Sequence, residues 1–311
     1  MATCLNSLAL LSKDQGRYAQ AEPLFTRALA IDEKALGPAH PLLANSLLGL
    51  ASIYSSQGLY ARAEPLYMRA LAIREKALGP YHPEVANVLN NLAELYRGQG
   101  QFAQAEPLYT RTLEIREKAL GPDHRGVATC LNNLALLYQD QGQYSRAEPL
   151  YTRALAIYEK ALGPDHPSTA GSLNNLANLF LSQRKYTEAE PLLTRALAMR
   201  RKALGPEHLD VAASLSNLAR ASQALGKTVE ARQGFDKALA MLRRLSPEGS
   251  PVFARILWRS ASARLDNKDA AAALPELEEA VALAEKFLPP EHPYLKEYRE
   301  TLAKCREAIA K

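Results

Sequence analysis

The sequence has 311 residues, of which 47% are hydrophobic, so the chain is long enough to bury a sizeable core. Aromatic residues make up only 7%, leucine and alanine dominate, and long runs of valine, isoleucine or threonine do not occur, which favours an all-α protein. The formal net charge of +5 comes from 38 basic and 33 acidic residues that are interspersed, a pattern that argues against nucleic-acid binding.

Cysteine usage and hydropathy indicate the compartment. The three cysteines, Cys4, Cys130 and Cys305, are far apart, so we expect a reducing environment and no disulfide framework, with Cys4 and Cys130 as buried thiols. No apolar run approaches the ~18 residues of a membrane span, and no secretory signal pattern opens the chain. We therefore expect a cytoplasmic protein that does not contact a membrane.

Internal repetition organises the chain. The Leu-Gly-Pro triplet returns every 42 residues without insertion or deletion, beginning at Leu36, Leu78, Leu120, Leu162 and Leu204. Residues 85–124 and 127–166 differ at only a minority of positions. A fixed period of this size predicts an array of stacked structural repeats.

Each repeat has the pattern of two helices, which the third repeat illustrates. The first helix is predicted at about Pro83–Arg97, because proline is tolerated at the first helical position and Gly100 marks a tight turn. The second helix is predicted at about Ala103–Leu120. There, Gly121 provides a left-handed C-terminal cap and Pro122 prevents continuation.

Glycine and proline residues at equivalent positions divide the rest of the chain in the same way. Helix pairs are predicted at 1–37, 39–79, 81–121, 123–163, 165–205, 207–247 and 249–288. A final helix at about 293–310 is polar on one side, as expected of a cap that closes a repeat array. We therefore predict a single repeat domain over residues 1–311, a right-handed α-solenoid of stacked antiparallel helix pairs with a C-terminal capping helix.

Helical spacing also predicts the core of a repeat. The residues expected to face one another across the third helix pair are Leu89, Leu92, Ala93 and Tyr96 on the first helix and Ala105, Tyr109 and Leu113 on the second. Pro107 is placed near the end of the first turn of the second helix, where few backbone hydrogen bonds are lost. We therefore expect a slight bend there and no break.

These small and aromatic residues resemble the tetratricopeptide repeat, whose common unit has about 34 residues. With its longer unit and the motifs L-N-N-L-A, Y-x-x-A-E-P-L-Y, R-A-L-x-I and E-K-x-L-G-x-x-H-P, the chain is similar to the repeats of kinesin light chains and of related bacterial proteins. The resemblance covers essentially the whole chain and implies a scaffold that binds a protein or peptide. Light chains also carry an N-terminal heptad coiled coil, which this sequence lacks, so we do not expect a complete light chain.

Two adjacent asparagines stand inside the predicted first helices, although asparagine is a poor helix former. One column consists of Asn6, Leu48, Asn90, Asn132, Asn174 and Ser216. At about 100° per residue this column lies about a quarter-turn from the core direction, on the expected concave surface. The second column points toward the neighbouring repeat and consists of Ser7, Gly49, Asn91, Asn133, Asn175 and Asn217.

Two interpretations of these columns are open. Amides can tie adjacent first helices together, which we expect of the second column. A row of amides can also bind the backbone of an extended peptide, because an amide both donates and accepts, and we expect this of the first column. In kinesin light chains groove asparagines are implicated in cargo-peptide binding, and the resemblance implies this role for Asn90, Asn132 and Asn174.

Neighbouring groove positions would set specificity. The predicted peptide-binding residues are Asn6, Asn87, Asn90, Glu94, Arg97, Asn132, Gln139, Asn174, Asn178, Arg220 and Trp258. Kinesin light chains use basic groove residues against acidic cargo, and Arg97 and Arg220 match that pattern only in part. Trp258, the only tryptophan, either stacks on a ligand or packs under the last helix.

Histidines recur in the turn between repeats, at His40, His82, His124, His166, His208 and, in a variant turn, His292. One histidine per repeat cannot form a metal site, because adjacent repeats are about 10 Å apart and metal–nitrogen bonds are about 2 Å long. We expect these side chains to stabilise the turn, with no metal and no cofactor. Gly226-Lys227-Thr228 lacks the earlier glycine of a phosphate loop, and no catalytic motif occurs, so an enzyme is not expected.

The preferred function is therefore a non-enzymatic scaffold that binds a protein or peptide in a concave groove. One alternative is a regulatory or sensor module of a larger signalling protein or complex. Another is self-association through the N-terminal end, where the sequence provides no cap over Leu5 and Leu8.

Overall fold

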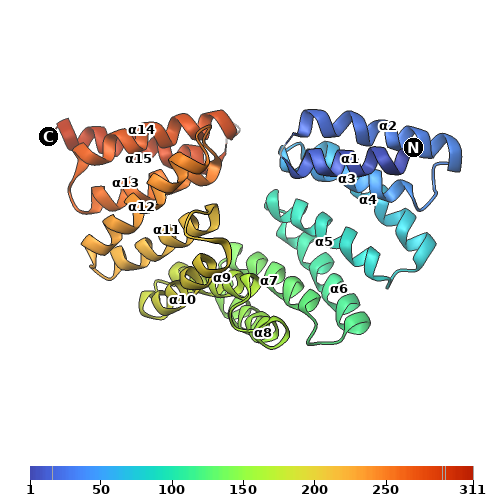
Figure 1. Cartoon of the computed structure of the whole chain (residues 1–311), viewed down its shortest axis with the longest axis horizontal. Coiled ribbons are helices and arrows are strands. Elements are labelled where there is room, and N and C mark those ends of the chain that lie inside the picture. Colours follow the sequence, from blue (N-terminus) through green and yellow to red (C-terminus); the bar gives the residue numbers. More distant parts are fainter. Residues whose placement is uncertain (16, 289, 291, 311) are drawn as a thin grey trace. The chain divides into compact units, whose positions relative to one another are not determined.

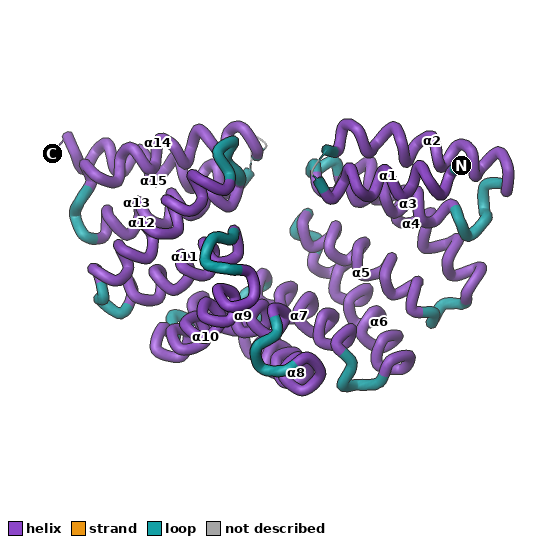
Figure 2. The backbone as a smooth tube through the Cα atoms, viewed as in Figure 1, coloured by secondary structure: helices purple, strands orange, loops and turns teal. Residues whose placement is uncertain are grey.

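A computed structural model describes residues 1–15, 17–288, 290 and 292–310. Within these residues there are fifteen helices and no strand, which confirms the predicted all-α fold (Figure 1). The helices alternate with short turns along the described chain (Figure 2). Internal contacts divide the chain into two compact units, Met1–Ile157 and Tyr158–Lys311, and each is described by itself. The single continuous domain stays a prediction.

Each of the seven ranges predicted for a helix pair contains two helices. The first helices of the pairs are α1 (Ala2–Asp14), α3 (Leu43–Ser56), α5 (Pro83–Gly98), α7 (Arg125–Asp140), α9 (Pro167–Ser182), α11 (Leu209–Ala224) and α13 (Pro251–Asp266). The second helices are α2 (Tyr18–Leu36), α4 (Tyr60–Leu78), α6 (Phe102–Leu120), α8 (Tyr144–Leu162), α10 (Tyr186–Leu204), α12 (Thr228–Leu245) and α14 (Ala270–Phe287). Helix α15 (Pro293–Ala310) packs on α14 and α13, in the position of the predicted cap.

Consecutive helices pack on one another within each unit. In the first unit, consecutive helices from α1 through α7 contact each other, and α3 also contacts α1 and α5. In the second unit, consecutive helices from α9 through α15 contact each other, and α11 also contacts α9 and α13. First helices of adjacent repeats therefore lie beside one another, which is the packing of a tetratricopeptide-type α-solenoid.

The helix ends follow the predicted glycine positions with one correction. Gly121 after α6 has the predicted positive φ of 85°, but its ψ of 155° is extended, so the cap is not left-handed helical. This combination of φ and ψ is open essentially only to glycine. Glycine is therefore required at position 121 because its φ is positive and its ψ is extended, and not because the residue adopts the predicted left-handed helical conformation.

Two predictions for α6 are wrong in detail. Pro107 is the sixth residue of α6 and lies in the second turn, so the carbonyl of Ala103 loses its helical partner. On the core face, Ala105 and Tyr109 are buried as predicted, but Leu113 is only half-buried. The fully buried Thr112 takes its place, because a small residue allows the two helices of the pair to approach closely.

The histidines in the turns between repeats cap the helices that follow. Nδ1 of His82, for example, accepts a hydrogen bond from the backbone N–H of Glu84 at 3.2 Å. The same bond forms at His124, His166, His208 and His292. At His40 the bonded N–H belongs to Leu42, which precedes α3, so this histidine stabilises the turn without capping the helix. The predicted turn-stabilising role is confirmed, and its mechanism is an N-cap that satisfies one free N–H of the first turn.

The cysteines are free, as predicted, but one position differs. Cys130 and Cys305 are buried, whereas Cys4 on α1 is exposed. Among the described helices, α1 packs on α2 and α3 only, so the side of α1 that a preceding repeat would cover is open. Burial raises the pKa of the Cys130 thiol to about 11.

Candidate functional site

Asparagines of the two columns bind each other between adjacent first helices. In the first unit, Nδ2 of Asn133 on α7 donates to Oδ1 of Asn90 on α5 at 2.8 Å. In the second unit, Nδ2 of Asn217 on α11 donates to Oδ1 of Asn174 on α9 at 3.0 Å. Each bond joins the first column of one repeat to the second column of the next, so Asn133 and Asn217 have the tying role expected of the second column.

These bonds use only part of the capacity of the first column. The side-chain carbonyls of Asn90 and Asn174 are occupied, but their NH₂ groups have no hydrogen-bond partner within the described residues. Asn132 differs, because its Oδ1 is buried without a hydrogen-bond partner in the described chain. An amide whose oxygen is fixed presents its N–H donors in a set direction. A role of these donors in ligand binding stays a prediction.

Other predicted site residues also contact neighbouring side chains. The pairs are Asn6 with Ser46, Asn87 with Arg116, Arg97 with Asp140 and Gln139 with Tyr151. Arg97 and Asp140 form an ion pair at 2.6 Å that connects α5 to α7. Glu94 is exposed and Asn178 is half-buried. Two of these contacts, Asn6–Ser46 and Arg97–Asp140, join adjacent first helices, and the other two join a first helix to a second helix.

Sequence reasoning missed the role of the glutamate in the repeated Ala-Glu-Pro motif. In the first unit this glutamate accepts a hydrogen bond from a tyrosine of the following first helix, in Tyr54–Glu22, Tyr96–Glu64 and Tyr138–Glu106. Arg146 donates to both Glu106 and Tyr138, and its hydrogen bond holds the pKa of Glu106 below its usual range. The constant separation of 32 residues between tyrosine and glutamate is the signal that predicts these pairs.

Two of the predicted residues, Arg220 and Trp258, line a cavity of about 770 Å³ in the second unit. The Trp258 ring stacks on Tyr298 of α15 with centroids 5.5 Å apart, and Nε1 of Trp258 donates to Thr301 at 3.0 Å. Trp258 therefore packs under the last helix, which was one of the two interpretations. Its side chain also lines the cavity, so a contact with a ligand is sterically open.

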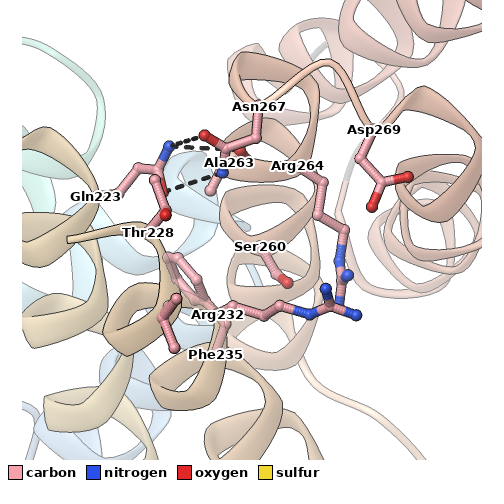
Figure 3. A pocket seen from close by; sticks show the side chains of 10 residues that line it. Gln223, Thr228, Arg232, Phe235, Ser260, Ala263, Arg264, Asn267 and Asp269 are labelled. Atoms are coloured by element: carbon pink, nitrogen blue, oxygen red, sulfur yellow. Dashed lines mark hydrogen bonds between the residues drawn. The ribbon is translucent and has the colours of Figure 1, made fainter. Parts of the chain in front are cut away.

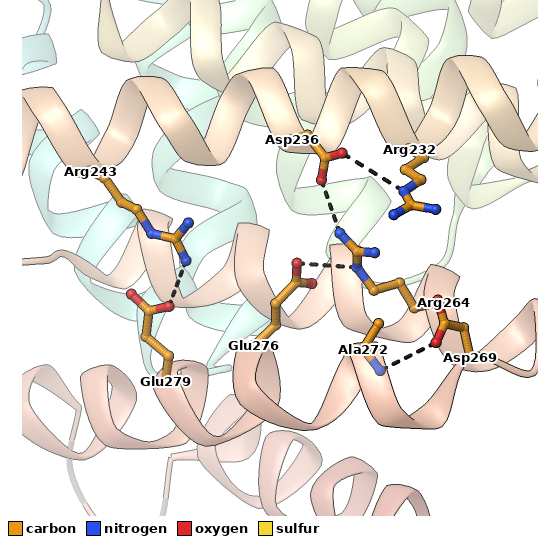
Figure 4. Close-up of polar contacts among 8 residues, drawn as sticks. All are labelled: Arg232, Asp236, Arg243, Arg264, Asp269, Ala272, Glu276 and Glu279. Atoms are coloured by element: carbon orange, nitrogen blue, oxygen red, sulfur yellow. Dashed lines mark hydrogen bonds and ion pairs between the residues drawn. The ribbon is translucent and has the colours of Figure 1, made fainter.

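A second cavity of about 350 Å³ is lined by ten residues, most of which Figure 3 labels. It lies next to the first cavity, with which it shares Gln223, Phe235 and Ala263. Gln223 donates to Asn267 across it at 3.2 Å. Arg264 of this cavity pairs with Asp236 at 2.9 Å and with Glu276 at 3.1 Å (Figure 4). The positive charge of Arg264 is therefore already neutralised within the protein.

The described residues contain no group of three or more histidine, cysteine, aspartate or glutamate side chains placed to hold a metal ion. No described helix has the length and apolar character needed to cross a membrane.

The comparison with family models identifies the class of protein. A tetratricopeptide-repeat model matches residues 1–76, 48–118, 84–160, 138–202 and 168–244. The chain belongs to the tetratricopeptide-repeat family. A comparison with curated proteins found no match.

Solved structures narrow the resemblance to kinesin-light-chain-like repeats. A kinesin light chain of Podosopora anserina with nearly identical TPR-like repeats is 31% identical with a TM-score of 0.57, over 66% of this chain and 97% of that chain. BtubC (BKLC) from P. vanneervenii is 25% identical with a TM-score of 0.58, over 80% and 93% of the two chains. A Rap protein complexed with Competence and Sporulation Factor shares the fold, at 14% identity and a TM-score of 0.61 over 99% and 98%.

Proposed function

We propose that this tetratricopeptide-repeat protein is a non-enzymatic scaffold that binds an extended peptide segment of a partner along its first helices. The observation that supports this proposal most directly is the orientation of Asn90 and Asn174 by Asn133 and Asn217. Each inter-helix bond fixes an amide and leaves its NH₂ group without a partner in the described chain. Such donors match the carbonyl groups of a bound peptide backbone.

The spacing of the repeats supports an extended ligand. Adjacent first helices are separated by about 10 Å, and an extended chain advances about 3.3 Å per residue. One amide per repeat would then contact about every third residue of the peptide. Contacts to the backbone do not require particular side chains, so neighbouring groove residues such as Glu94 would select among sequences.

The proposal is tested with a variant that removes only the free donors. The substitutions Asn90→Asp and Asn174→Asp keep the carboxyl oxygen that accepts from Asn133 and Asn217, but they eliminate the NH₂ group. Wild-type protein is used to select binders from a library of random linear peptides. The selected peptides are then titrated against the wild type and the double variant. We expect the variant to lose about tenfold or more in affinity while its helicity is unchanged.

Threonines on the second helices provide the matched control. Thr110→Ala and Thr194→Ala remove exposed polar groups whose hydroxyls bind their own backbone in the same two repeats. This control should bind the selected peptides as the wild type does. Equal affinity of the wild type and the aspartate variant would show that the asparagines are structural only. Self-association and a regulatory role stay predictions.

A further inference from the structure

Three arginines share the larger cavity of the second unit, and none of them forms an ion pair within the described residues. Arg220 on α11 and Arg255 and Arg259 on α13 line it. Nη1 of Arg259 donates to Oδ1 of Asn217 at 2.9 Å, whereas Nε of Arg255 is buried without a hydrogen-bond partner in the described chain. Since Asn217 also binds Asn174, a chain of hydrogen bonds connects this cavity to the first asparagine column.

Arginines close to this cavity do have acidic partners. Arg264, five residues beyond Arg259 on the same helix, forms ion pairs with two carboxylates (Figure 4). Arg243 on α12 pairs with Glu279 at 2.9 Å (Figure 4). Helix α13 therefore carries one arginine neutralised by the protein and two that face a cavity without an ion pair among the described residues.

The arginines of the shared cavity repel one another. Burial, and then the charges of Arg220 and Arg255, lower the pKa of Arg259 to about 9. Burial also lowers the pKa of Arg220, and the charge of Arg255 adds to this effect. The cavity is lined in total by four arginines and by two carboxylates, Asp266 and Glu297. Arg220, Arg255 and Arg259 are half-buried, whereas the fourth arginine, Arg184, and the two carboxylates are exposed. An excess of partly buried positive charge opposes folding unless an anion binds there.

The capping helix builds one wall of the cavity. Tyr294 and Tyr298 of α15 line it together with Trp258, and the two tyrosine rings stack with centroids 6.4 Å apart. Tyr298 is almost fully buried, at 2% exposure, whereas Tyr294 is 48% exposed. The cavity therefore combines an aromatic wall with a set of guanidinium groups.

We propose that this cavity binds the phosphate group of a phosphorylated side chain on a partner peptide. A phosphate monoester carries about −1.5 to −2 charges and three acceptor oxygens near neutral pH, which suits the excess of two positive charges and the three guanidinium groups. A single carboxylate would neutralise only one charge. The cavity volume of about 770 Å³ leaves room for the residues on either side of the phosphate. The peptide part of this proposal rests on the proposed scaffold function.

The sole tryptophan gives a direct readout. Because Trp258 lines the cavity, its fluorescence is titrated with capped Gly-Gly-Xaa-Gly-Gly peptides in which Xaa is phosphoserine, glutamate or serine, and with inorganic phosphate. We expect the phosphoserine peptide to half-saturate the signal at a concentration about tenfold or more below that of the other three probes. Equal binding of the glutamate peptide would identify a carboxylate site and overturn the proposal. Equal binding of inorganic phosphate would overturn the peptide part.

Substitutions separate binding from folding. Arg255→Gln and Arg259→Gln should each weaken phosphopeptide binding by about tenfold or more, while the melting temperature does not fall, because each removes a repelling charge. Arg220→Gln on α11 provides the same test from a different helix. The control is Arg232→Gln, at an exposed arginine of the neighbouring cavity, which should bind as the wild type does. Unchanged affinity in all three cavity variants would overturn the proposal.

The two proposals fail separately. Asn90→Asp alters an amide of the first unit and should leave the response of Trp258 to the phosphoserine peptide intact. If random peptides bind without the asparagine donors but the phosphopeptide still requires the arginines, the groove proposal fails and the phosphate site stands. If Trp258 does not respond to the phosphoserine peptide, the phosphate site fails whatever the asparagine variant shows.

Discussion

His124 shows how one side chain sets the start of a helix. Helix α7 begins with Arg125 and Gly126, neither of which is a favourable first-turn residue. Nδ1 of His124 accepts the backbone N–H of Gly126 at 3.0 Å and so satisfies one of the N–H groups that lack a helical partner. The imidazole of His124 thus acts as the N-cap, a role that serine, aspartate or asparagine has at most helix starts.

Replacing His124 by alanine should lower the free energy of unfolding by about 1 kcal/mol, because the cap is lost. His124→Asn should recover most of this loss, since the asparagine oxygen can accept the same N–H. The measurement is the urea midpoint of both variants and the wild type, followed by circular dichroism. An alanine variant as stable as the wild type would show that the bond is dispensable.

For single residues, the sequence predicts the helix face on which a side chain lies better than it predicts the side chain to which it binds. Helical spacing places Asn90 on a polar face and Asn133 toward the neighbouring helix, and both assignments agree with the observed bond. That these two amides meet depends on the separation and stagger of α5 and α7, which spacing within one helix does not contain. The unpaired arginines were missed for a related reason, because Arg255 and Arg259 lie in the degenerate last pair.

At the scale of the helix, two glycines make a matched test of packing against helix propensity. A Cβ on Gly49 of α3 would lie 2.3 Å from a ring carbon of Phe25, whereas one on Gly171 of α9 would meet nothing within 4 Å. Gly171→Ala should raise the free energy of unfolding by about 0.5–1 kcal/mol through helix propensity alone. Gly49→Ala gains the same stabilisation from helix propensity, but the variant should be less stable than the wild type overall, because overpacking against Phe25 costs about 1–3 kcal/mol.

Urea unfolding of both alanine variants beside the wild type measures this difference. Shifts of the midpoint in opposite directions are expected. If Gly49→Ala is stabilised as much as Gly171→Ala, the Phe25 ring can adopt another rotamer that accommodates the added methyl group. The close packing of Phe25 on Gly49 is then not required for stability.

Helix α15 is expected to be required for solubility. Its buried residues Leu295, Tyr298 and Cys305 cover apolar side chains of α13 and α14. A chain that ends after residue 288 should therefore expose this surface and associate. Light scattering against protein concentration measures the effect beside the full chain. A truncated chain that stays monomeric at all concentrations would show that α15 is not a cap.

The helices themselves were largely predictable. The predicted and observed bounds of α5 and α6 agree to within one residue, because Pro83 marks the start of α5, Gly100 marks the turn between the helices and Gly121 marks the end of α6. What spacing alone did not give was the backbone geometry at Gly121 or the burial of Thr112 in place of Leu113. Both depend on how closely neighbouring helices approach, which is a property of the packed pair.

At the scale of the whole molecule, buried tyrosines should control stability in alkali. Burial raises the pKa of Tyr109 to about 12, and Tyr67, Tyr151 and Tyr298 are also shifted upward by burial. A raised pKa means that the unfolded chain releases its phenolic proton first as the pH rises. Stability is therefore unaffected below about pH 10 and falls between about pH 10 and pH 12.

Tyr109→Phe isolates one such group. Between about pH 8 and pH 11, the wild type should lose about 1 kcal/mol more than the variant, since phenylalanine has no proton to release. The urea midpoint at both pH values gives the difference. Tyr81→Phe, at a tyrosine that is 63% exposed, serves as the control and should keep the pH dependence of the wild type. Parallel losses in wild type and Tyr109→Phe would contradict the assignment.

Each kind of side-chain bond between repeats joins residues at a fixed and short separation along the sequence. Tyrosine binds glutamate over 32 residues, arginine binds glutamate over 36, and asparagine binds asparagine over 43, so each reaches only the adjacent repeat. A gene segment that encodes 42 residues can therefore be duplicated or deleted, and the side chains that recur in every regular repeat meet equivalent partners at the new junction. Unequal recombination can change the copy number without disturbing the interfaces. The arginine cavity, which depends on the irregular last pairs and α15, would be inherited once, at the C-terminal end.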